Sequence, residues 1–576
     1  MPLSRNQHKG KVMKKRLLRI VVGIAFFTIT DLYCFGDKTI FGIRSQGLDG
    51  VRELTGWQQI MYKYDQGSNY GTIAMVAEYT RTFRPQEIAQ FLFGGSCLNF
   101  SGSRAERKPG DVLADYFGLP ASFSSTVTFS PHVSNVIIDF NWFQAFDAYV
   151  PGLFIMVHLP VVHTKWNLYA QEGNINPGNA FYPAGYMSNA RIPAASLPQS
   201  VTQALRGNTI FGDMDQPLQF GKVFGRQTRS RIAELTATLG WNYNQPGYHV
   251  GVNFRVGAPT GNATTAEFIF ESIVGNRHHW DVGGGLSAHA IMWQDKDQGR
   301  RIGLYFDAHV SHLFTSQQKR SFDFTKNGNG SRYILLEQIE SPAQNLLING
   351  IAPLNQYIGN LVPAINHTTF DTKISIGVQA DIVLKLAYQR DWFEIDLGYN
   401  FWANSKEKLH CRDAFIEDRF ALKGDAQIYG FAADNTAVEL NATQSMATIL
   451  GGQGNGNANF ANLNADNQPA LASTAAGVLN QLNSADSTAL NIPQVQVRGS
   501  NPAILLKDSD INNESGILPR ALSHRVFAYM GHMWDNRDDI DPYFGIGLSG
   551  EFANTNSCNN VACSQWAIWF KGGLSY

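Results

Sequence analysis

Residues 566–576, Trp566-Ala-Ile-Trp-Phe-Lys-Gly-Gly-Leu-Ser-Tyr576, are the stretch of this sequence that decides the fold. Alternate residues of a β-strand point to opposite faces of the sheet. One face would carry Trp566, Ile568, Phe570, Gly572, Leu574 and Tyr576, and the other Ala567, Trp569, Lys571, Gly573 and Ser575. The stretch is therefore predicted to be a strand with one apolar, aromatic-rich face that ends on an aromatic residue.

A final amphipathic strand that closes on an aromatic residue resembles the C-terminal signal of bacterial outer-membrane β-barrels. Here the usual glycine spacing is off by one, at Lys571-Gly572. The resemblance implies insertion by the outer-membrane assembly machinery, with Trp566, Ile568, Phe570, Leu574 and Tyr576 as lipid-facing and signal residues. The last strand of a soluble β-sandwich would show the same alternation, so the rest of the chain has to separate the two.

The composition favours a protein rich in β-structure with few charges. Only 16% of the 576 residues are charged, against about 25% in average soluble domains, while 12% are aromatic and 54 are glycine. Beyond the N-terminus, no apolar run approaches the ~20 residues of a spanning helix. A transmembrane β-barrel and a large secreted β protein both fit these values. The formal net charge of -1 argues against a nucleic-acid partner.

The N-terminus has the layout of a secretory signal peptide, predicted over residues 1–35. Basic residues between Lys9 and Arg19 precede the apolar run Ile20–Phe27, and Asp31 closes it. Cleavage is expected near Cys34 to Gly36. A membrane-anchor helix is the alternative, which the shortness of the apolar run disfavours.

The cysteines permit disulfides in an exported protein. If Cys34 is removed with the signal, an even number remains: Cys97, Cys411, Cys558 and Cys563. The pair Cys558 and Cys563 brackets a short Asn-rich turn and is the disulfide candidate, while a Cys97–Cys411 bridge has no support. A zinc site is not expected, because no Cys-x-x-Cys pair or nearby His completes a tetrahedral set.

From residue 123 onward the chain reads as a series of hairpins. Period-two alternation is clearest at 233–243 with 248–256 and at 373–388 with 393–401. Further pairs are predicted at 136–143 with 153–159, at 280–292 with 302–311 and at 525–534 with 544–552, before the terminal strand. Residues 36–120 are either an N-terminal extension or the first barrel strands, since 70–80 reads as a strand and 85–92 as a helix or strand.

Short turns alternate with long connections along the chain. With Tyr576 on the periplasmic side, the turns near residues 147, 244, 295, 389 and 536 are periplasmic, and the long connections 163–230, 258–278, 315–371 and 403–522 are extracellular. Outer-membrane barrels sort their loops in this way. We therefore predict an all-β fold, a transmembrane antiparallel up-and-down barrel of about 12 strands (10–14) over residues 121–576. Its longest loop, 403–522, has an Asn/Ala/Gln/Gly-rich tract expected to be mobile or partly helical.

The polar faces of the predicted strands are expected to line a water-filled lumen, where charges cost little. The predicted pore-lining residues are Glu234, Arg255, Asp281, Asp307, Lys373, Asp381, Lys385, Glu394, Asp396 and Glu551. Acidic residues outnumber basic ones in this set, which predicts a mild cation preference.

No catalytic motif stands out. His249, His289 and His309 fall on polar faces near Ser287 and Asp307, and a hydrogen-bonded lumen network explains them better than a hydrolase site does. We expect no enzyme activity, cofactor or metal. The favoured function is a porin-like outer-membrane channel for small hydrophilic solutes, in contact with the lipid bilayer and with homo-oligomerisation left open. The alternative is a surface-exposed adhesin, antigen or host-interaction protein whose pore is plugged by loops, and whether the 403–522 loop fills the pore is left open.

Overall fold

The computed structural model describes residues 35–57, 60–64, 67–295, 299–340, 356–426, 428–431, 437–439, 443–451, 503–534, 540–553 and 560–576. The predicted signal peptide and most of the Asn-rich tract lie outside these ranges. Within them, no helix is both long and apolar enough to cross a membrane.

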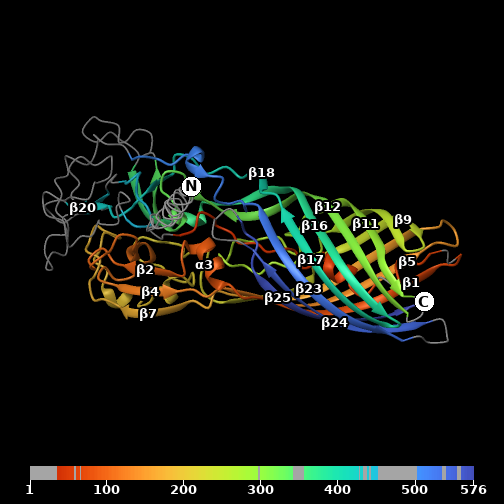
Figure 1. The fold of residues 1–576 in the computed structure, drawn as a ribbon. Coiled ribbons are helices and arrows are strands. Elements are labelled where there is room, and N and C mark those ends of the chain that lie inside the picture. Colours follow the sequence, from red (N-terminus) through yellow and green to blue (C-terminus); the bar gives the residue numbers. More distant parts are fainter. Residues whose placement is uncertain are drawn as a thin grey trace, which may run out of the picture. The chain divides into compact units, whose positions relative to one another are not determined.

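Twelve antiparallel strands form a closed barrel (Figure 1). Around the ring they are β12 (Arg300–Ser321), β11 (Asp281–Asp295), β10 (Tyr248–Ala258), β9 (Leu235–Gln245), β6 (Leu153–Asn167), β5 (His132–Ala145), β1 (Tyr70–Thr82), β25 (Gln565–Ser575), β24 (Asp541–Phe552), β23 (Ala521–Met533), β17 (Phe393–Asn404) and β16 (Thr369–Arg390). The pairing of β12 with β16 closes the ring. Closure removes sheet edges and pairs the backbone polar groups, as a membrane requires. The predicted barrel class and strand count are confirmed.

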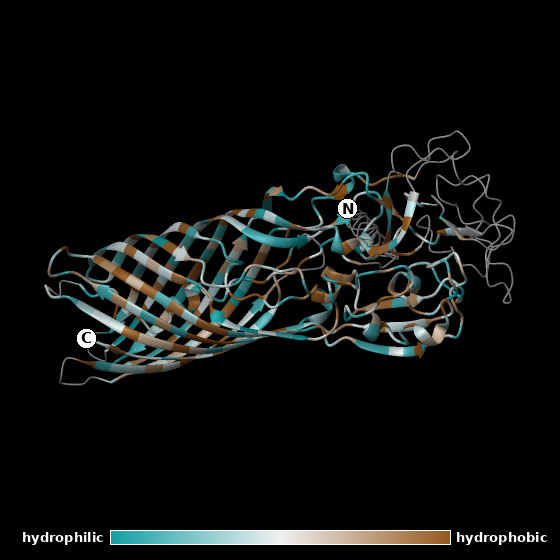
Figure 2. Cartoon of the chain, turned by 180° about the vertical axis from the view of Figure 1, so that it is seen from behind, coloured by the Kyte–Doolittle hydropathy of each residue, from teal (hydrophilic) through white to brown (hydrophobic). Residues whose placement is uncertain are grey.

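Alternation along each strand separates an apolar outside from a polar inside. On β25, Trp566, Phe570 and Leu574 are exposed, whereas Trp569 and Lys571 are buried. On β16, Leu384 is 43% exposed and the adjacent Lys385 is 0% exposed. Figure 2 shows brown apolar segments alternating with teal polar ones along the barrel strands. An apolar outer band with charges turned inward is the arrangement of a transmembrane barrel.

Short turns and long connections lie at opposite ends of the barrel, called here the turn end and the cap end. The strand β1 belongs to the ring and pairs with β25 and β5. It lies within residues 36–120, which the sequence alone left open as either an N-terminal extension or the first barrel strands. Two short strands extend the ring toward the cap end. The strand β8 (Arg226–Ile232) pairs with β6 on the cap side of the β6–β9 pairing, and β18 (Glu407–Arg412) pairs with β16.

The predicted lumen position of Lys373 is wrong. The pairing of β12 with β16 contains register shifts between Ser311 and Ser316, and a bulge turns the following side chains over. At the cap end of β16, Thr372 and Ile374 are therefore buried, while Lys373 is exposed. Strict alternation extrapolated through the bulge put this lysine on the wrong face.

The long connections fold together into a structured cap. Its described elements are α3 (Pro85–Phe93), β2 (Cys97–Ser101), β3 (Val112–Leu113), η1 (Ala114–Phe117), β4 (Ser124–Thr128), β7 (Gln171–Asn176), η2 (Ala194–Ser196), α4 (Val201–Ala204), β13 (Asp323–Phe324), η3 (Ser331–Tyr333), β14 (Leu335–Glu340), β15 (Gln356–Pro363), η4 (Ala364–Asn366), β19 (Phe420–Leu422), β20 (Tyr429–Phe431), β21 (Ala437–Glu439), η7 (Asp508–Asp510) and β22 (Ile511–Asn512). A shared hydrophobic core joins side chains from several connections, among them Phe93, Tyr182 and Leu336. The cap is thus a folded body built from residues far apart in the sequence.

The structure decides the open assignment of residues 85–92 in favour of a helix, α3. Pro85 stands at the first helical position, where its missing N–H costs nothing. Gly94 ends the helix in the left-handed conformation, with φ 67°, which glycine adopts without strain. Ile88, Phe91 and Leu92 bury the apolar face of the helix in the cap core.

Cys563, one of the two cysteines of the predicted bridge, is buried with a free thiol. Cys558 itself lies outside the described residues. Cys97 and Cys411 are exposed and free.

A buried carboxyl in the cap makes its stability depend on pH. Glu337 on β14 is 0% exposed, and neither of its carboxylate oxygens has a hydrogen-bond partner among the described residues. Burial raises the pKa of Glu337 well above its usual value, and nearby Lys423 opposes this only in part. The folded cap therefore holds the proton of Glu337 more tightly than the unfolded chain does.

We expect Glu337→Gln to reduce the loss of cap stability as pH rises. In the native protein the favourable protonation of Glu337 is complete below the unfolded pKa of about 4.5 and is lost as pH rises toward the higher folded pKa. Proteolysis of the cap against temperature, between about pH 5 and 7, measures this slope and stays below the lowered pKa of Lys423, about 8. The control is Glu340→Gln, which changes a partly exposed carboxyl on the same strand. Equal slopes for native protein and Glu337→Gln would contradict the prediction.

Candidate functional site: the occupied barrel lumen

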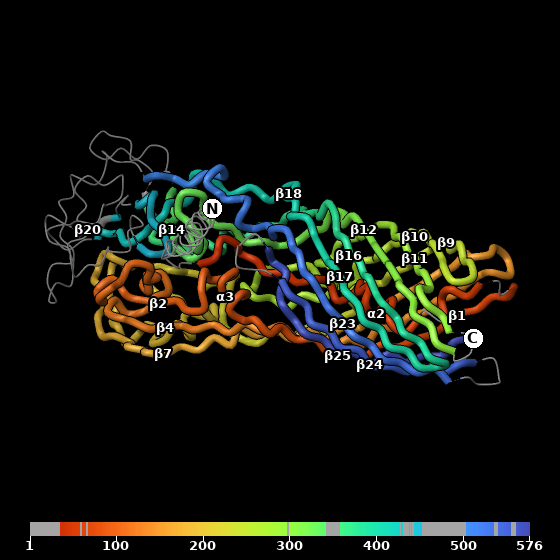
Figure 3. Tube along the Cα trace, viewed as in Figure 1, coloured from red at the N-terminus to blue at the C-terminus, as the bar shows by residue number. Residues whose placement is uncertain are grey.

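The N-terminal part of the described chain passes through the barrel. Phe35 and Phe41 pack in the cap core, while Trp57 packs with Phe143 and Tyr543 near the turn end. Between them, residues 42–57, called here the lumen segment, contact the inner faces of the barrel strands. Figure 3 shows their helix α2 (Gly50–Leu54) among the barrel strands. The connection to β1 then begins at the turn end.

The helix α2 is a single turn with a well-defined start. Asp49 caps it and accepts hydrogen bonds from the backbone N–H groups of Val51 and Arg52. Gly50 lies against the wall: a Cβ there would come within 2.9 Å of Val383, and its N–H donates to Asp381 at 3.0 Å. Any larger residue at position 50 would push the segment away from the wall.

Charged side chains of the lumen segment pair with buried charges on six barrel strands. Arg44 reaches Asp381 on β16 at 2.7 Å, and Asp49 reaches Arg525 on β23 at 2.6 Å. Arg52 lies between Glu78 on β1, at 2.6 Å, and Asp139 on β5, at 3.5 Å. Glu53 accepts from Arg255 on β10 at 2.7 Å, and Arg44 also lies 4.0 Å from Glu551 on β24.

Two wall lysines hold the C-terminal end of α2. Lys571 on β25 donates to the carbonyl oxygens of Arg52 and Thr55 at 2.8 and 2.7 Å. Lys385 on β16 donates to the Leu54 carbonyl at 2.9 Å and pairs with Asp396 at 3.0 Å. Backbone carbonyls at a helix C-terminus carry partial negative charge, so ammonium groups are favourable there.

Apolar contacts complete the docking of the segment. Val51 and Leu54 pack with wall residues that include Val383, Phe527 and Trp569. Buried ion pairs add little net stability compared with apolar packing, but removing one partner leaves an expensive unpaired charge. The matched charges therefore specify one position and register of the segment in the lumen.

Aromatic rings close the turn end of the lumen. Trp57 donates from Nε1 to the Tyr543 hydroxyl at 2.9 Å, and Lys571 lies 4.1 Å from the Trp57 ring centroid. Tyr62 stacks on His249 with centroids 3.7 Å apart. The ring of His249 in turn faces His289, which stacks on Tyr305.

These histidines do not form a hydrolase triad. The Nε2 of His249 lies 3.2 Å from Ser287 Oγ, but its Nδ1 faces His289 rather than a carboxylate. His309 pairs with Asp307 at 2.8 Å, and its Nε2 also lies 3.3 Å from the Arg255 guanidinium. The groups are distributed over a network that fills the space around Tyr62.

The other predicted pore-lining residues lie on the inner side of the barrel, and the lumen segment meets about half of them. Glu234, Arg255, Asp381, Lys385 and Glu551 contact the segment, Glu234 through Ser45. Asp281 instead lies beside Asn276, Glu394 beside Gln389, and Asp396 pairs with Lys385. Sequence reasoning missed Glu78 and Arg525, because the strands that carry them alternate poorly. It also missed the segment's own charges, whose only signal is their density between Arg44 and Glu53.

Small hollows follow the segment along its length. One of about 310 Å³ is lined by charged groups that include Arg44, Asp49 and Glu78, and one of about 250 Å³ lies between Leu48, Arg255 and Asp381.

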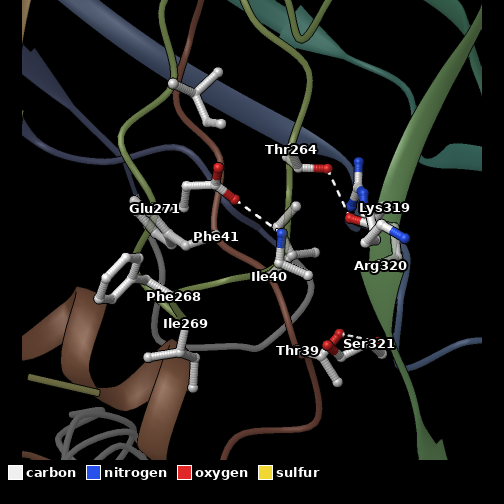
Figure 4. Close-up of a pocket in the computed structure, with 12 residues that line it drawn as sticks. Thr39, Ile40, Phe41, Thr264, Phe268, Ile269, Glu271, Lys319, Arg320 and Ser321 are labelled. Atoms are coloured by element: carbon white, nitrogen blue, oxygen red, sulfur yellow. Dashed lines mark hydrogen bonds between the residues drawn. The ribbon is translucent and has the colours of Figure 1, made fainter. Parts of the chain in front are cut away.

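A further hollow of about 300 Å³ lies where the segment leaves the cap (Figure 4). Thr39, Ile40 and Phe41 form one side, the connection 264–273 forms the second, and the cap end of β12 forms the third. Thr264 donates to the Lys319 carbonyl at 2.9 Å, and Thr39 donates to the Ser321 carbonyl at 2.5 Å. The Thr39 hydrogen bond fixes the chain just before the lumen segment to the cap end of β12.

Comparison of the sequence with known protein families found no match, and comparison with curated proteins found none. Solved structures with some likeness include an outer membrane channel from Pseudomonas putida F1, at 8% identity, covering 90% of this chain and 98% of that chain with a TM-score of 0.31. The Pseudomonas putida toluene transporter TodX follows at 8% identity, with 95% and 98% covered and a TM-score of 0.27. A Pseudomonas aeruginosa FadL homologue shows 7% identity, 88% and 90% coverage and a TM-score of 0.25. Similarity at this level carries no weight for function, which has to be inferred from the chain itself.

Proposed function

We propose that this protein is an outer-membrane channel closed by its own N-terminal segment, and that it conducts small hydrophilic solutes when residues 42–57 leave the lumen. The observation that carries the proposal is the match between the charges of the segment and those of the wall. A segment needed only to fill space would be packed by apolar side chains, as in an ordinary core. Here water can take over the polar contacts when the segment leaves.

The wall without its segment would favour cations. Its buried carboxyl groups are Glu78, Asp139, Glu234, Asp281, Asp381, Glu394, Asp396 and Glu551, whereas its buried basic groups are Arg255, Lys385, Arg525 and Lys571. Charged rings of one sign set the selectivity of a pore. The mild cation preference is thus a property proposed for the open state.

The proposed location rests on the barrel's apolar outer band and on the predicted signal peptide. Insertion by the outer-membrane assembly machinery, a non-enzymatic role and possible homo-oligomerisation belong to the same proposal. A surface interaction protein is the second candidate, favoured by the folded cap, which presents large parts of six connections at one end of the barrel.

Single-channel recording in planar bilayers tests the proposal. The chain without its signal peptide should insert with little conductance, whereas the chain lacking residues 36–57 should give steady, cation-selective steps. A synthetic peptide of residues 36–57 added on the cap side should block those steps. Heat-modifiable migration in gels checks that the shortened chain has folded.

A shortened barrel that folds and inserts but conducts no more than the complete chain would contradict the channel. The surface-interaction function would then become the better account.

A further inference from the structure

Basic side chains gather on the outer face of the barrel where β1, β5, β6 and β8 approach the cap. In the strand register, Arg81 lies opposite Ser134, Ser134 opposite Lys165, and Lys165 opposite Thr228. Arg226 lies two residues along β8 from Thr228, on the same face. Arg81, Lys165 and Arg226, with the hydroxyls between them, form what we call the basic row.

The spacing brings the three cations within reach of one headgroup. Neighbouring strands are about 4.8 Å apart, so Arg81 and Lys165, two strands apart, have Cα atoms about 10 Å from each other. Lys165 and Arg226 are diagonal neighbours, about 7–8 Å apart at most. Their long side chains can converge on one or two phosphate groups, and Ser134 and Thr228 add hydroxyl donors between them.

These three cations are unpaired over the part of the chain that the structure describes. Among the described residues, Arg81, Lys165 and Arg226 make no ion pair or side-chain hydrogen bond. No Asp or Glu occupies an outward position on β1, β5, β6 or β8, because Glu78 and Asp139 both point into the lumen. Elsewhere near the cap, the half-buried Lys319 and the exposed Lys406 are each paired with a carboxylate.

The row stands at the edge of the apolar band. On β5, outward residues from Trp142 to Val136 are apolar and exposed, and Ser134 follows them. A spanning strand needs about 9–11 residues, and Trp142 to Ser134 is a stretch of nine on one strand. Val161 continues the apolar surface on β6, below His163 and Lys165. A molecule bound to the row would lay its apolar part along this strip.

We propose that the basic row binds the phosphorylated headgroup of a lipid in the outer leaflet, with the lipid's acyl chains lying along the apolar strip of β5 and β6. The proposal rests on the outer-membrane location given above but not on channel activity. The charge complementarity is that of basic residues at an anionic membrane surface, which contribute about fivefold in affinity each.

The test uses the folded full chain in detergent, titrated with lipid A that carries its phosphates and with the same lipid after their removal. Native mass spectrometry counts the lipid retained. The variant Arg81→Gln/Lys165→Gln/Arg226→Gln should bind the phosphorylated lipid about 100-fold more weakly and the dephosphorylated lipid as the native chain does. Binding to the native chain should also weaken with added salt, since exposed charges are screened. The control Arg390→Gln removes an exposed cation at the turn end and should bind as the native chain does.

Unchanged retention of the phosphorylated lipid by the triple variant would overturn the proposal. Retention of inorganic phosphate alone by the native chain, as strong as that of the phosphorylated lipid, would also overturn it. The row would then recognise free phosphate and not a lipid. The bilayer conductance of the triple variant should equal that of the native chain, which keeps failure of this proposal distinct from failure of the channel.

Discussion

Arg52→Met should open the lumen of the otherwise complete chain. Arg52 lies between two buried wall carboxylates, 2.6 Å from Glu78 and 3.5 Å from Asp139, and it also donates to the Gln46 and Gly47 carbonyls. Removing one partner of a buried ion pair costs about 3–5 kcal/mol, because the remaining charge stays buried and unpaired. In the undocked state water can hydrate both carboxylates, so the cost falls on the closed state alone.

The closed-to-open equilibrium should therefore shift by about two to four orders of magnitude. Planar-bilayer recording would show frequent cation-selective openings where the native chain is mostly silent. Lys38→Met is the matched control: it makes the same replacement of a cation in the same stretch of chain, but Lys38 donates to the Glu514 carbonyl in the cap. It should leave the channel closed.

A rescue variant separates charge from packing. Arg52→Met combined with Glu78→Gln and Asp139→Asn removes the stranded charges and should restore much of the closure. If Arg52→Met stays as silent as the native chain, or if the rescue variant is as open as Arg52→Met, the ion pairs do not hold the segment in place.

Leu384→Arg should prevent much of the chain from folding into a bilayer. Leu384 points outward from β16, opposite Phe306 on β12 and Tyr399 on β17, in the middle of the apolar band. An arginine on the lipid face near the bilayer midplane costs about 2–4 kcal/mol. The heat-modifiable fraction after refolding into vesicles measures the loss, and urea titration gives its free energy.

Gln317→Arg provides the matched control, because Gln317 is exposed on the cap end of β12, beyond the apolar band. Lys385→Leu changes the next residue, which points into the barrel. This variant should insert normally, although it removes the ammonium group that donates to the Leu54 carbonyl. Equal folding of Leu384→Arg and the native chain would show that this face does not meet lipid.

Period-two patterns allowed the barrel to be predicted because the two faces of a strand are formed by residues close together in the sequence. In β9, β10 and β25 the alternation of apolar and polar residues indicates which face meets lipid. The alternation of short turns with long connections along the chain predicts the up-and-down topology. The pattern failed where local geometry departs from a regular strand. The bulge on β16 moved Lys373 outward, and α3 needed Pro85 and Gly94 to be recognised as a helix rather than a strand.

By itself, then, the sequence determined a closed barrel of about twelve strands, its apolar outer face and the inward direction of most of its charges. Only the tertiary structure decided what fills the lumen. Residues 42–57 have no repeating pattern, since their contacts come one by one from strands hundreds of residues away: Arg44 meets Asp381, Asp49 meets Arg525, and Lys571 meets the end of α2. Pairing between such distant charges depends on the closed ring that brings them together. The sequence pattern around either partner therefore does not predict it.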